Sequence, residues 1–544
     1  MTVIPHTYFD TTHPRTRLRI SGYGSLFFVI LAVTFLLRFD GRQFNTIFYD
    51  EAIYATLGRE ILAGDYSQQP IIWTYGSVLY PAVSAIADNL GGYTALRLLS
   101  AFLSTFSAAM VFAIGWRMFG TKAALWGLVL FAVAGPSISL GQFAVYDSLG
   151  VALLSAALWA LVESAYNPRW QVYLLLITAC CASLSVLSKY IGILFLPPLF
   201  MVGLIVYLAR GRSILPLITL LLLPIAYILT QYAVMNFDGL ARMFNELRNI
   251  THAGLETWAI IQELVYEAGP LLALGIISAL LIPFAPFNRT QMPLLVRGLL
   301  LLVLPLLMAS LLVAPFYHLL TGTVQALWKH MVYLLVFCAP LAGYFMATLV
   351  QQLSLPHRKF GRLLRFSWAL VTLVTLLWYL NDSLARNWGW QRSWPDVTNA
   401  LDYLRTQPLR RESRVLAEQS AIYEYYFDLG AFDRQVWTNT FFMQYSNLEG
   451  VEAMVTSIQD QYFDLVILDD YYTAETNRLL EAALLQNGYT LTYQDPQPQV
   501  LTTGQTIVIR IYQLEEARDV QTLSTTFPIL PDPFGIGAQS LLAD

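Results

Sequence analysis

Long runs of hydrophobic residues fill most of the first 382 positions and predict membrane-spanning helices. A hydrocarbon core of about 30 Å needs about 20 apolar residues per helix, and the sequence contains eleven such runs. Their approximate spans are 20 to 38, 97 to 117, 123 to 142, 149 to 165, 170 to 188, 191 to 209, 213 to 235, 268 to 286, 294 to 317, 331 to 352 and 366 to 381. This pattern predicts an α-helical polytopic membrane domain.

The basic residues between these runs predict how the chain is oriented. The first run is long and lacks a small-residue cleavage site before Asp40, so we interpret it as a retained helix rather than a signal peptide. With a cytoplasmic N-terminus, every inner segment carries positive residues, as the positive-inside rule requires. They are Arg15, Arg17 and Arg19; Arg117 and Lys122; Arg169; Arg210 and Arg212; Arg289 and Arg297; and His357, Arg358, Lys359, Arg362 and Arg365. Because the number of runs is odd, we expect everything after Asn381 to lie outside the cytoplasm.

The pattern changes in the last part of the chain, where short β-type runs alternate with helical ones. The runs predict helices, strands and a layered α/β fold. The expected elements are helices at 396 to 406, 449 to 460 and 474 to 487, and strands at 414 to 417, 463 to 468, 489 to 493 and 506 to 512. We therefore predict a transmembrane domain at 1–382 and a soluble extracytoplasmic α/β domain at 383–544.

Composition and charge agree with this division. The whole chain is 56% hydrophobic and 12% charged, with a mean hydropathy of +0.53, as in polytopic membrane proteins. The last 162 residues hold 21 acidic and 10 basic side chains. An acidic exposed domain repels phosphates, so we expect no nucleic-acid partner.

Two adjacent carboxylates, Asp50 and Glu51, are the first candidates for chemistry. They lie in the long loop from Phe39 to Leu96, and charged groups beside a bilayer are costly and usually functional. The segment 50 to 62 is predicted to form an amphipathic helix lying flat on the membrane surface. Two interpretations stay open: the acids take part in a reaction, or they stabilise the start of this helix through its dipole.

A third acid, Asp147, is expected at the same membrane depth, between the third and fourth runs. It could belong to the same outward-facing cavity, or it could cap the following helix. Cations on this face are unexpected from the charge bias and could hold a lipid phosphate, although they could also be snorkelling anchors. These cations are Arg97, Lys189, Lys329 and His330.

The order of three segments resembles a known group of membrane enzymes. A long first loop with "FYDEAIYATLGREILAGDY" is followed by "YTALRLLSAFLSTFSAAMVFAIGWRMFG" and "FAVYDSLGVALLSAALWALV". This arrangement is similar to the GT-C glycosyltransferases of the protein O-mannosyltransferase, aminoarabinose transferase and RgtA-like group. The resemblance implies a GT-C fold and transfer of a sugar from a polyprenyl-phosphate donor to a glycan, lipid or protein acceptor at the outer face of the membrane, by an inverting displacement.

The resemblance also implies roles for individual residues. Asp50 resembles the catalytic base of the group, Glu51 its neighbour, and Asp147 the second acidic motif. The donor phosphate is then expected to contact Arg97, Lys189 and His330. A divalent ion, Mg²⁺ or Mn²⁺, bridging Asp147, Glu51 and the phosphate is left open, since carboxylate and phosphate oxygens suit these ions.

Two other classes of function remain alternatives. A transporter or flippase of lipid-linked sugars would also place charges and proline-broken helices inside the membrane, but the sequence shows no pair of matched halves. A non-catalytic receptor or assembly subunit could use the acidic C-terminal domain as a sensor. Breakage of the sugar–phosphate bond separates an enzyme from both.

Overall fold

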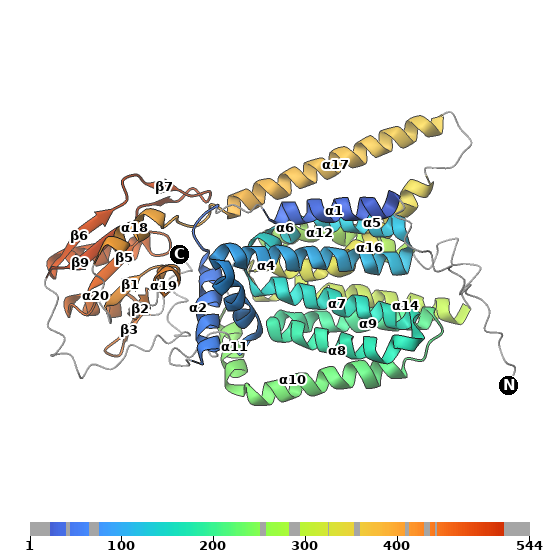
Figure 1. Ribbon diagram of the computed structural model, residues 1–544, viewed down its shortest axis with the longest axis horizontal. Coiled ribbons are helices and arrows are strands. Elements are labelled where there is room, and N and C mark those ends of the chain that lie inside the picture. The colour runs from blue at the N-terminus through green and yellow to red at the C-terminus, as the bar shows by residue number, and fades with distance from the viewer. Residues whose placement is uncertain are drawn as a thin grey trace.

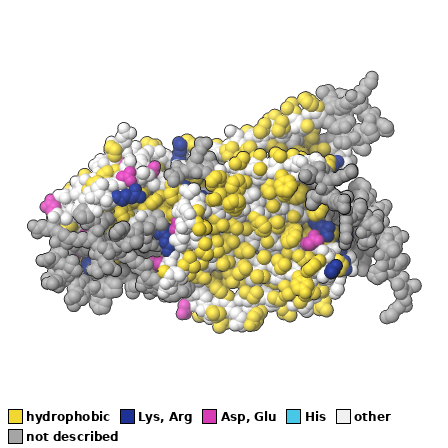
Figure 2. Space-filling model, in the orientation of Figure 1, with side chains coloured by type: hydrophobic (Ala, Val, Ile, Leu, Met, Phe, Trp, Pro, Cys, Tyr) yellow, Lys and Arg dark blue, Asp and Glu magenta, His cyan; other side chains and the backbone are white. Residues whose placement is uncertain are grey.

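A bundle of apolar helices adjoins a mixed α/β domain in the computed structural model (Figure 1). The structure describes residues 22–39, 44–64, 76–250, 257–281, 294–324, 326–352, 360–407, 413–428, 436–440 and 443–515. Several of the predicted inner cations, at positions 15, 17, 19, 289 and 357–359, lie outside these ranges. Figure 2 shows that hydrophobic side chains cover the flank of the bundle, whereas the charged ones gather toward its two ends.

The helices of the bundle coincide with the eleven predicted runs. Nine segments of the described chain are long and apolar enough to cross a membrane, and the pair α5–α6, bent by 63°, adds a tenth. The shorter apolar helix α1 matches the first run. The bundle comprises α1 (Gly22–Arg38), α4 (Leu79–Phe119), α5 (Thr121–Val133), α6 (Gly135–Gln142), α7 (Tyr146–Tyr166), α8 (Gln171–Ser188), α9 (Leu196–Ala209), α10 (Leu223–Met235), α12 (Thr257–Leu281), α14 (Leu294–Leu311), α15 (Val313–Thr321), α16 (Leu327–Gln352) and α17 (Phe360–Trp390). Short helical turns η1 (Pro168–Trp170), η2 (Tyr190–Phe195) and η3 (Leu217–Leu222) adjoin α8, α9 and α10.

The predicted domain boundary after residue 382 falls inside α17, which continues to Trp390. The continuation carries buried polar residues at a spacing of four, which the hydropathy pattern cannot distinguish from a solvated segment. Ser383 donates to the carbonyl oxygen of Val133 at 3.0 Å, and Asn387 donates to Gln142. Hydrogen bonds to α5 and α6 thus replace apolar packing at this point.

The long first loop is also more helical than predicted. Helix α4 already begins at Leu79, and its two parts meet at a kink where Gly91 and Gly92 leave the helical conformation. Gly92 has a φ of +62°, which a residue with a Cβ rarely adopts. The residues before Arg97 were predicted to belong to the loop, because the apolar run that predicts this membrane helix begins only at Arg97.

Helix α2 (Tyr49–Ala63) crosses the end of the bundle, as expected for a helix parallel to the membrane surface (Figure 1). It packs between α4 and α19 (Ser420–Asp428) of the C-terminal domain. Ala52, Ala55 and Leu57 are consequently buried. The C-terminal domain therefore covers α2 rather than leaving one side of it in water. A further helix, α11 (Phe237–Ile250), follows α10 near the same end (Figure 1).

The C-terminal domain is built on a five-stranded sheet with the order β2-β1-β5-β9-β6. Strands β1, β2 and β5 run parallel, while β9 pairs antiparallel with β5 and β6. The predicted α/β domain is confirmed, but helix α19 and strand β2 were missed. The elements are α18 (Thr398–Thr406), β1 (Arg414–Ala417), α19, β2 (Val436–Asn439), β3 (Gln444–Tyr445), β4 (Leu448–Glu449), α20 (Gly450–Gln459), β5 (Leu465–Leu468), α21 (Ala474–Gln486), β6 (Tyr489–Gln494), β7 (Gln499–Val500), β8 (Thr506–Ile507) and β9 (Arg510–Leu514).

Candidate active site

The predicted acids and cations converge where α2 crosses the bundle. Asp50 lies in the first turn of α2 and Asp147 in the first turn of α7. Lys189 follows the last residue of α8. Lys329 and His330 belong to the first turn of α16. The fold therefore brings together residues that are up to about 280 positions apart in the sequence.

Each of the first two acids pairs with one lysine. The Asp50 Oδ2 atom accepts a hydrogen bond from Lys329 Nζ at 2.7 Å, and the Asp50 side chain is 33% exposed. The Asp147 Oδ2 atom accepts from Lys189 Nζ at 2.9 Å, and this carboxylate is fully buried. Oδ1 of Asp147 has no hydrogen-bond partner within the described part of the chain. Since α7 is capped at Val145 without a side-chain bond, Asp147 is not a helix cap.

Tyrosine rings connect the two ion pairs. Tyr54 of α2 and Tyr146 of α7 have ring centroids 4.3 Å apart, and Lys189 Nζ lies 4.4 Å from the centroid of the Tyr146 ring. Asp50 and Asp147 both interact electrostatically with these two tyrosines. The two ion pairs thus share the same tyrosine neighbours, and the outward-facing cavity predicted around their acids stays a prediction. Neither tyrosine was a candidate, although Tyr146 directly precedes Asp147.

Glu51 has a different environment from its neighbour Asp50. It is buried and accepts hydrogen bonds from the backbone N–H groups of Phe48, at 2.9 Å, and Ala144, at 2.7 Å. Arg97 donates to both of its oxygens, from Nε at 3.1 Å and from Nη2 at 2.8 Å. The capping interpretation therefore holds for Glu51, which joins the start of α2 to α4 and to the segment before α7.

His330 forms a pair that the sequence analysis did not anticipate. Its Nδ1 atom lies 2.9 Å from Nε2 of His318 in α15, whose Nδ1 lies 2.9 Å from the carbonyl oxygen of Thr323. Nε2 of His330 is buried and has no partner among the described residues. The charges of Lys189 and Lys329 both act on His330. His318 closes an apolar stretch, and only the short distance along the chain between the two histidines could have indicated the pair.

The residues around Asp147 and Glu51 fit a bridging metal ion only in part. Asp147 has an unused oxygen, but both oxygens of Glu51 are occupied by Arg97 and by backbone N–H groups. Within the described ranges, no group of three or more His, Cys, Asp or Glu side chains could hold a metal ion. The bridging Mg²⁺ or Mn²⁺ ion stays a prediction, and we assign it no step of a reaction.

Comparisons with known proteins identify the fold. Residues 78–235 match the family model described as dolichyl-phosphate-mannose-protein mannosyltransferase. The structure is similar to that of ArnT from Cupriavidus metallidurans bound to undecaprenyl phosphate, with a TM-score of 0.54 and 13% identity over 90% of this chain and 98% of ArnT. It is also similar to the archaeal oligosaccharyltransferase AglB from Archaeoglobus fulgidus in complex with an inhibitory peptide and a dolichol-phosphate, with a TM-score of 0.50 and 13% identity over 90% of this chain and 74% of AglB.

A third similar structure is that of the arabinofuranosyltransferase AftD from Mycobacteria, with a TM-score of 0.53 and 14% identity over 91% of this chain and 40% of AftD. A search of curated proteins finds no significant match. The chain therefore has the fold of the GT-C superfamily of membrane glycosyltransferases. The predicted fold class and the predicted resemblance to this superfamily are confirmed.

Proposed function

We propose that this chain is a glycosyltransferase that moves a sugar from a polyprenyl-phosphate donor to an acceptor at the outer face of the membrane. The GT-C fold supports this proposal, and two of the similar structures contain undecaprenyl phosphate or dolichol-phosphate. The site lies at the end of the bundle that the charge bias assigns to the outside. The C-terminal domain adjoins the same end (Figure 1).

The observation that carries the proposal is the pairing of Asp50 with Lys329 beside a second such pair. An incoming phosphate competes with the carboxylates for both ammonium groups, because it carries negative charge and strong acceptor oxygens. Lys329 and Lys189 can therefore turn from the acids to the donor. This exchange frees Asp50, which is already partly exposed, to face an acceptor.

In the chemical step, Asp50 acts as general base. The acceptor hydroxyl loses its proton to the Asp50 carboxylate while its oxygen forms a bond to the anomeric carbon of the sugar. The bond from that carbon to the phosphate oxygen breaks, and its electron pair leaves with the polyprenyl phosphate. Attack from the opposite side inverts the anomeric centre. A positioned base of this kind typically contributes about 10² to 10⁴ in rate.

The other predicted residues take supporting roles in this mechanism. Lys189 stabilises the charge that develops on the leaving phosphate. Because Nδ1 of His318 faces a carbonyl oxygen and must donate, His330 donates from Nδ1 to His318, and the Nε2 atom of a neutral His330 is an acceptor. Contact between His330 and the donor phosphate therefore stays a prediction. Glu51 and Arg97, which bind each other inside the protein, position the first turn of α2 and hence Asp50. Direct contact between Arg97 and the donor phosphate stays a prediction.

A donor-cleavage assay tests the proposal. Full-length protein in lipid nanodiscs is incubated with a panel of undecaprenyl-phosphate-linked hexoses and pentoses, and mass spectrometry measures the undecaprenyl phosphate released in the presence of a membrane extract as acceptor. We expect release from at least one donor with the wild-type protein. Movement of intact lipid-linked sugar across proteoliposome membranes without bond cleavage would instead establish the flippase alternative.

A further inference from the structure

A short loop of the C-terminal domain is held rigidly by one buried carboxylate. Glu418, at the end of β1, is buried and receives the backbone N–H groups of Asp469 and Asp470 on Oε1, both at 3.0 Å. Its Oε2 atom receives those of Tyr472, at 3.0 Å, and Thr473, at 3.3 Å. Four backbone N–H groups in the segment Asp469–Thr473 are thus bonded to a single side chain, which fixes the loop that follows β5.

Further contacts hold the same loop from its other side. Gln505 donates from Nε2 to the carbonyl oxygens of Asp470 and Tyr471, at 2.6 and 2.8 Å. Asp470 has a φ of +61° and forms an ion pair with Arg510 at 2.6 Å. Aspartate adopts this left-handed conformation more readily than most residues with a Cβ, and here the ion pair with Arg510 holds it in place. The β5–α21 loop therefore presents its two tyrosines, Tyr471 and Tyr472, in a fixed arrangement.

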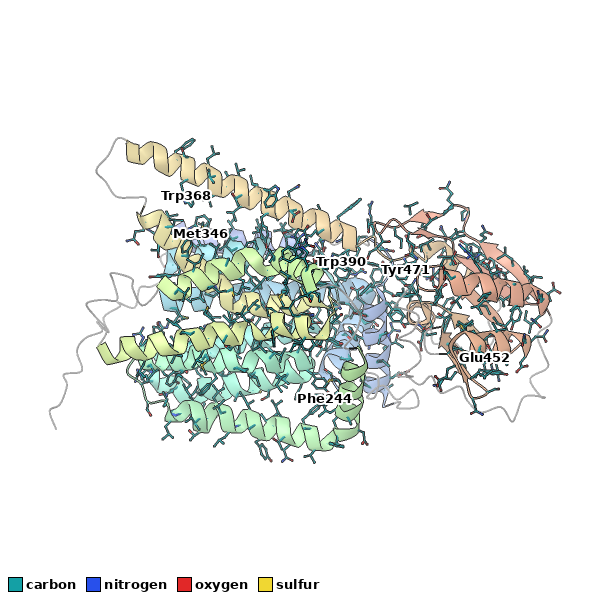
Figure 3. All side chains as sticks on the ribbon, turned by 180° about the vertical axis from the view of Figure 1, so that it is seen from behind. Phe244, Met346, Trp368, Trp390, Glu452 and Tyr471 are labelled. Atoms are coloured by element: carbon teal, nitrogen blue, oxygen red, sulfur yellow. The ribbon has the colours of Figure 1, made fainter. Side chains whose placement is uncertain are left out.

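The loop lies against the start of α2, beside Asp50. Asn439, at the end of β2, donates to the hydroxyl group of Tyr49 at 2.9 Å. Tyr471 packs against the hydrophobic core of the helix bundle and also against the hydrophobic residues around α19. Figure 3 places it at the junction of the bundle and the C-terminal domain. Partial burial, together with the neighbouring Tyr471, Tyr49 and Asp50, raises the pKa of Tyr472, so its hydroxyl group stays protonated.

Tyr472 is accessible although it lies so near the proposed base. Its side chain is 40% exposed, and the side chain of Asp50 is 33% exposed. A molecule that packs on the Tyr472 ring therefore reaches the region of the carboxylate. Aromatic rings pack well against flat apolar faces, while the tyrosine hydroxyl adds a hydrogen bond. The C–H faces and hydroxyl groups of a sugar ring meet both requirements.

The charges around the loop restrict the ligand further. Asp50 is paired with Lys329 and Asp470 with Arg510, and the C-terminal domain as a whole is acidic. Since both of these cations already have an anionic partner, they offer an anionic acceptor no free counter-charge, whereas a neutral acceptor needs none. We propose that Tyr471 and Tyr472 form the acceptor side of the site and bind a neutral sugar ring. This inference rests on the proposed function, since it makes the acceptor a neutral glycan.

A binding experiment with simple saccharides tests this surface. Full-length protein in nanodiscs is probed by saturation-transfer NMR with maltose and mannobiose, which are neutral, and with N-acetylneuraminic acid, which is anionic. We expect the neutral disaccharides to bind and Tyr472→Ala to weaken their binding at least tenfold. Tyr472→Phe, which keeps the ring, should have a smaller effect. The matched control is Tyr462→Ala, a partly buried tyrosine of the same domain that packs under Arg414.

The results separate this inference from the proposed function. The proposed sugar-binding role of Tyr471 and Tyr472 is wrong if the wild-type protein does not bind the disaccharides, or if Tyr472→Ala binds them as well as the wild-type protein does. Preference for the anionic sugar would also contradict it. Binding of a peptide or lipid headgroup in place of every saccharide also overturns it. Asp50→Asn should retain disaccharide binding. Loss of donor cleavage in this variant, with binding retained, therefore tests Asp50 as the general base and not the tyrosine surface. If the tyrosine surface binds sugars but no donor is cleaved, the surface stands and the transferase assignment fails.

Discussion

Two regions of this molecule hold buried or partly buried carboxylates, and they stabilise the negative charge in different ways. At the end of the bundle, Asp50 and Asp147 each meet a lysine ammonium group. In the C-terminal domain, Glu418 instead meets four backbone N–H groups and the amide of Asn477. A lysine has a long flexible side chain that can turn to another anion, whereas backbone groups stay where the fold puts them. The first arrangement suits binding and reaction, and the second suits a permanent support.

The sequence leaves open whether Glu51 reacts or stabilises the start of α2, and its environment favours the second. Its partners are backbone N–H groups and a buried arginine, so its environment is like that of Glu418 rather than that of adjacent Asp50. Unlike Asp147, it retains no free oxygen. Adjacent acids in one helical turn therefore have different environments: under the proposed function, Asp50 reacts and Glu51 supports the start of α2.

Asp50→Asn is the largest expected effect and the sharpest test of the comparison. The amide cannot accept the proton of the acceptor, so we expect donor turnover to fall by about 10² to 10⁴. Undecaprenyl phosphate affinity should not fall and should rise if anything, because the lysines remain and Lys329 no longer pairs with a charged carboxylate. Asp402→Asn, at an exposed ion pair with Arg405, is the control. Wild-type turnover in Asp50→Asn would mean that Asp50 is not the base. Asp50 and Glu51 would then no longer differ as a reacting and a supporting acid.

Glu51→Gln should act mainly on stability. Removing the charge leaves the buried Arg97 guanidinium unpaired, and breaking a buried ion pair costs about 3–5 kcal/mol. We expect a clearly lower midpoint of thermal unfolding in detergent. Glu163→Gln, at the partly exposed pair with Arg117, should shift it by little, since such pairs contribute about 1 kcal/mol or less. An unchanged midpoint with lost turnover would place Glu51 among the reacting groups instead.

The sequence predicted positions better than partners. Hydropathy located all eleven apolar runs, and the charge bias pointed to unexpected cations beside the acids, because both signals are local. The sequence does not show that Asp50 contacts Lys329, because that contact depends on how α16 packs against α2. The separation of Glu51 from Asp50 likewise depends on Arg97, which a neighbouring helix supplies.

Interpretation of the C-terminal acids shows the same limit. Asp469 and Asp470 directly follow a buried-type strand, a position where acids often serve only to end and solubilise a sheet edge. Strand β5 instead lies in the middle of the sheet, and Asp469 is completely buried. Its neighbours Glu418 and Gln419 directly follow β1, about 50 positions earlier in the chain. Strand order decides this environment, and the local pattern does not encode it.

Lys329→Met tests whether the ammonium groups can leave the acids for a phosphate. A hydrogen bond to a charged group contributes about 1.5–3 kcal/mol, so we expect undecaprenyl phosphate to bind about ten to a hundred times more weakly, as measured by native mass spectrometry in nanodiscs. Lys189→Met should behave similarly. Lys122→Met, exposed at the other end of the bundle, is the control. Wild-type affinity in both lysine variants would mean that these pairs are as permanent as the Glu418 support.

The smallest expected effect concerns Asp469 and the pH dependence of the support itself. Burial, and then the charge of Glu418, raise the pKa of Asp469 well above its ordinary value. The folded domain therefore holds a proton that the unfolded chain loses above about pH 4, and stability should fall as pH rises, by at most about 1.4 kcal/mol per unit. Asp469→Asn keeps the site neutral at every pH, so its unfolding midpoint should depend less on pH between 5 and 6 than that of the wild-type protein. Equal slopes would show that Asp469 is ionised in the folded domain. Asp469 would then be a charged carboxylate like Asp50 and Asp147, although no lysine pairs with it among the described residues.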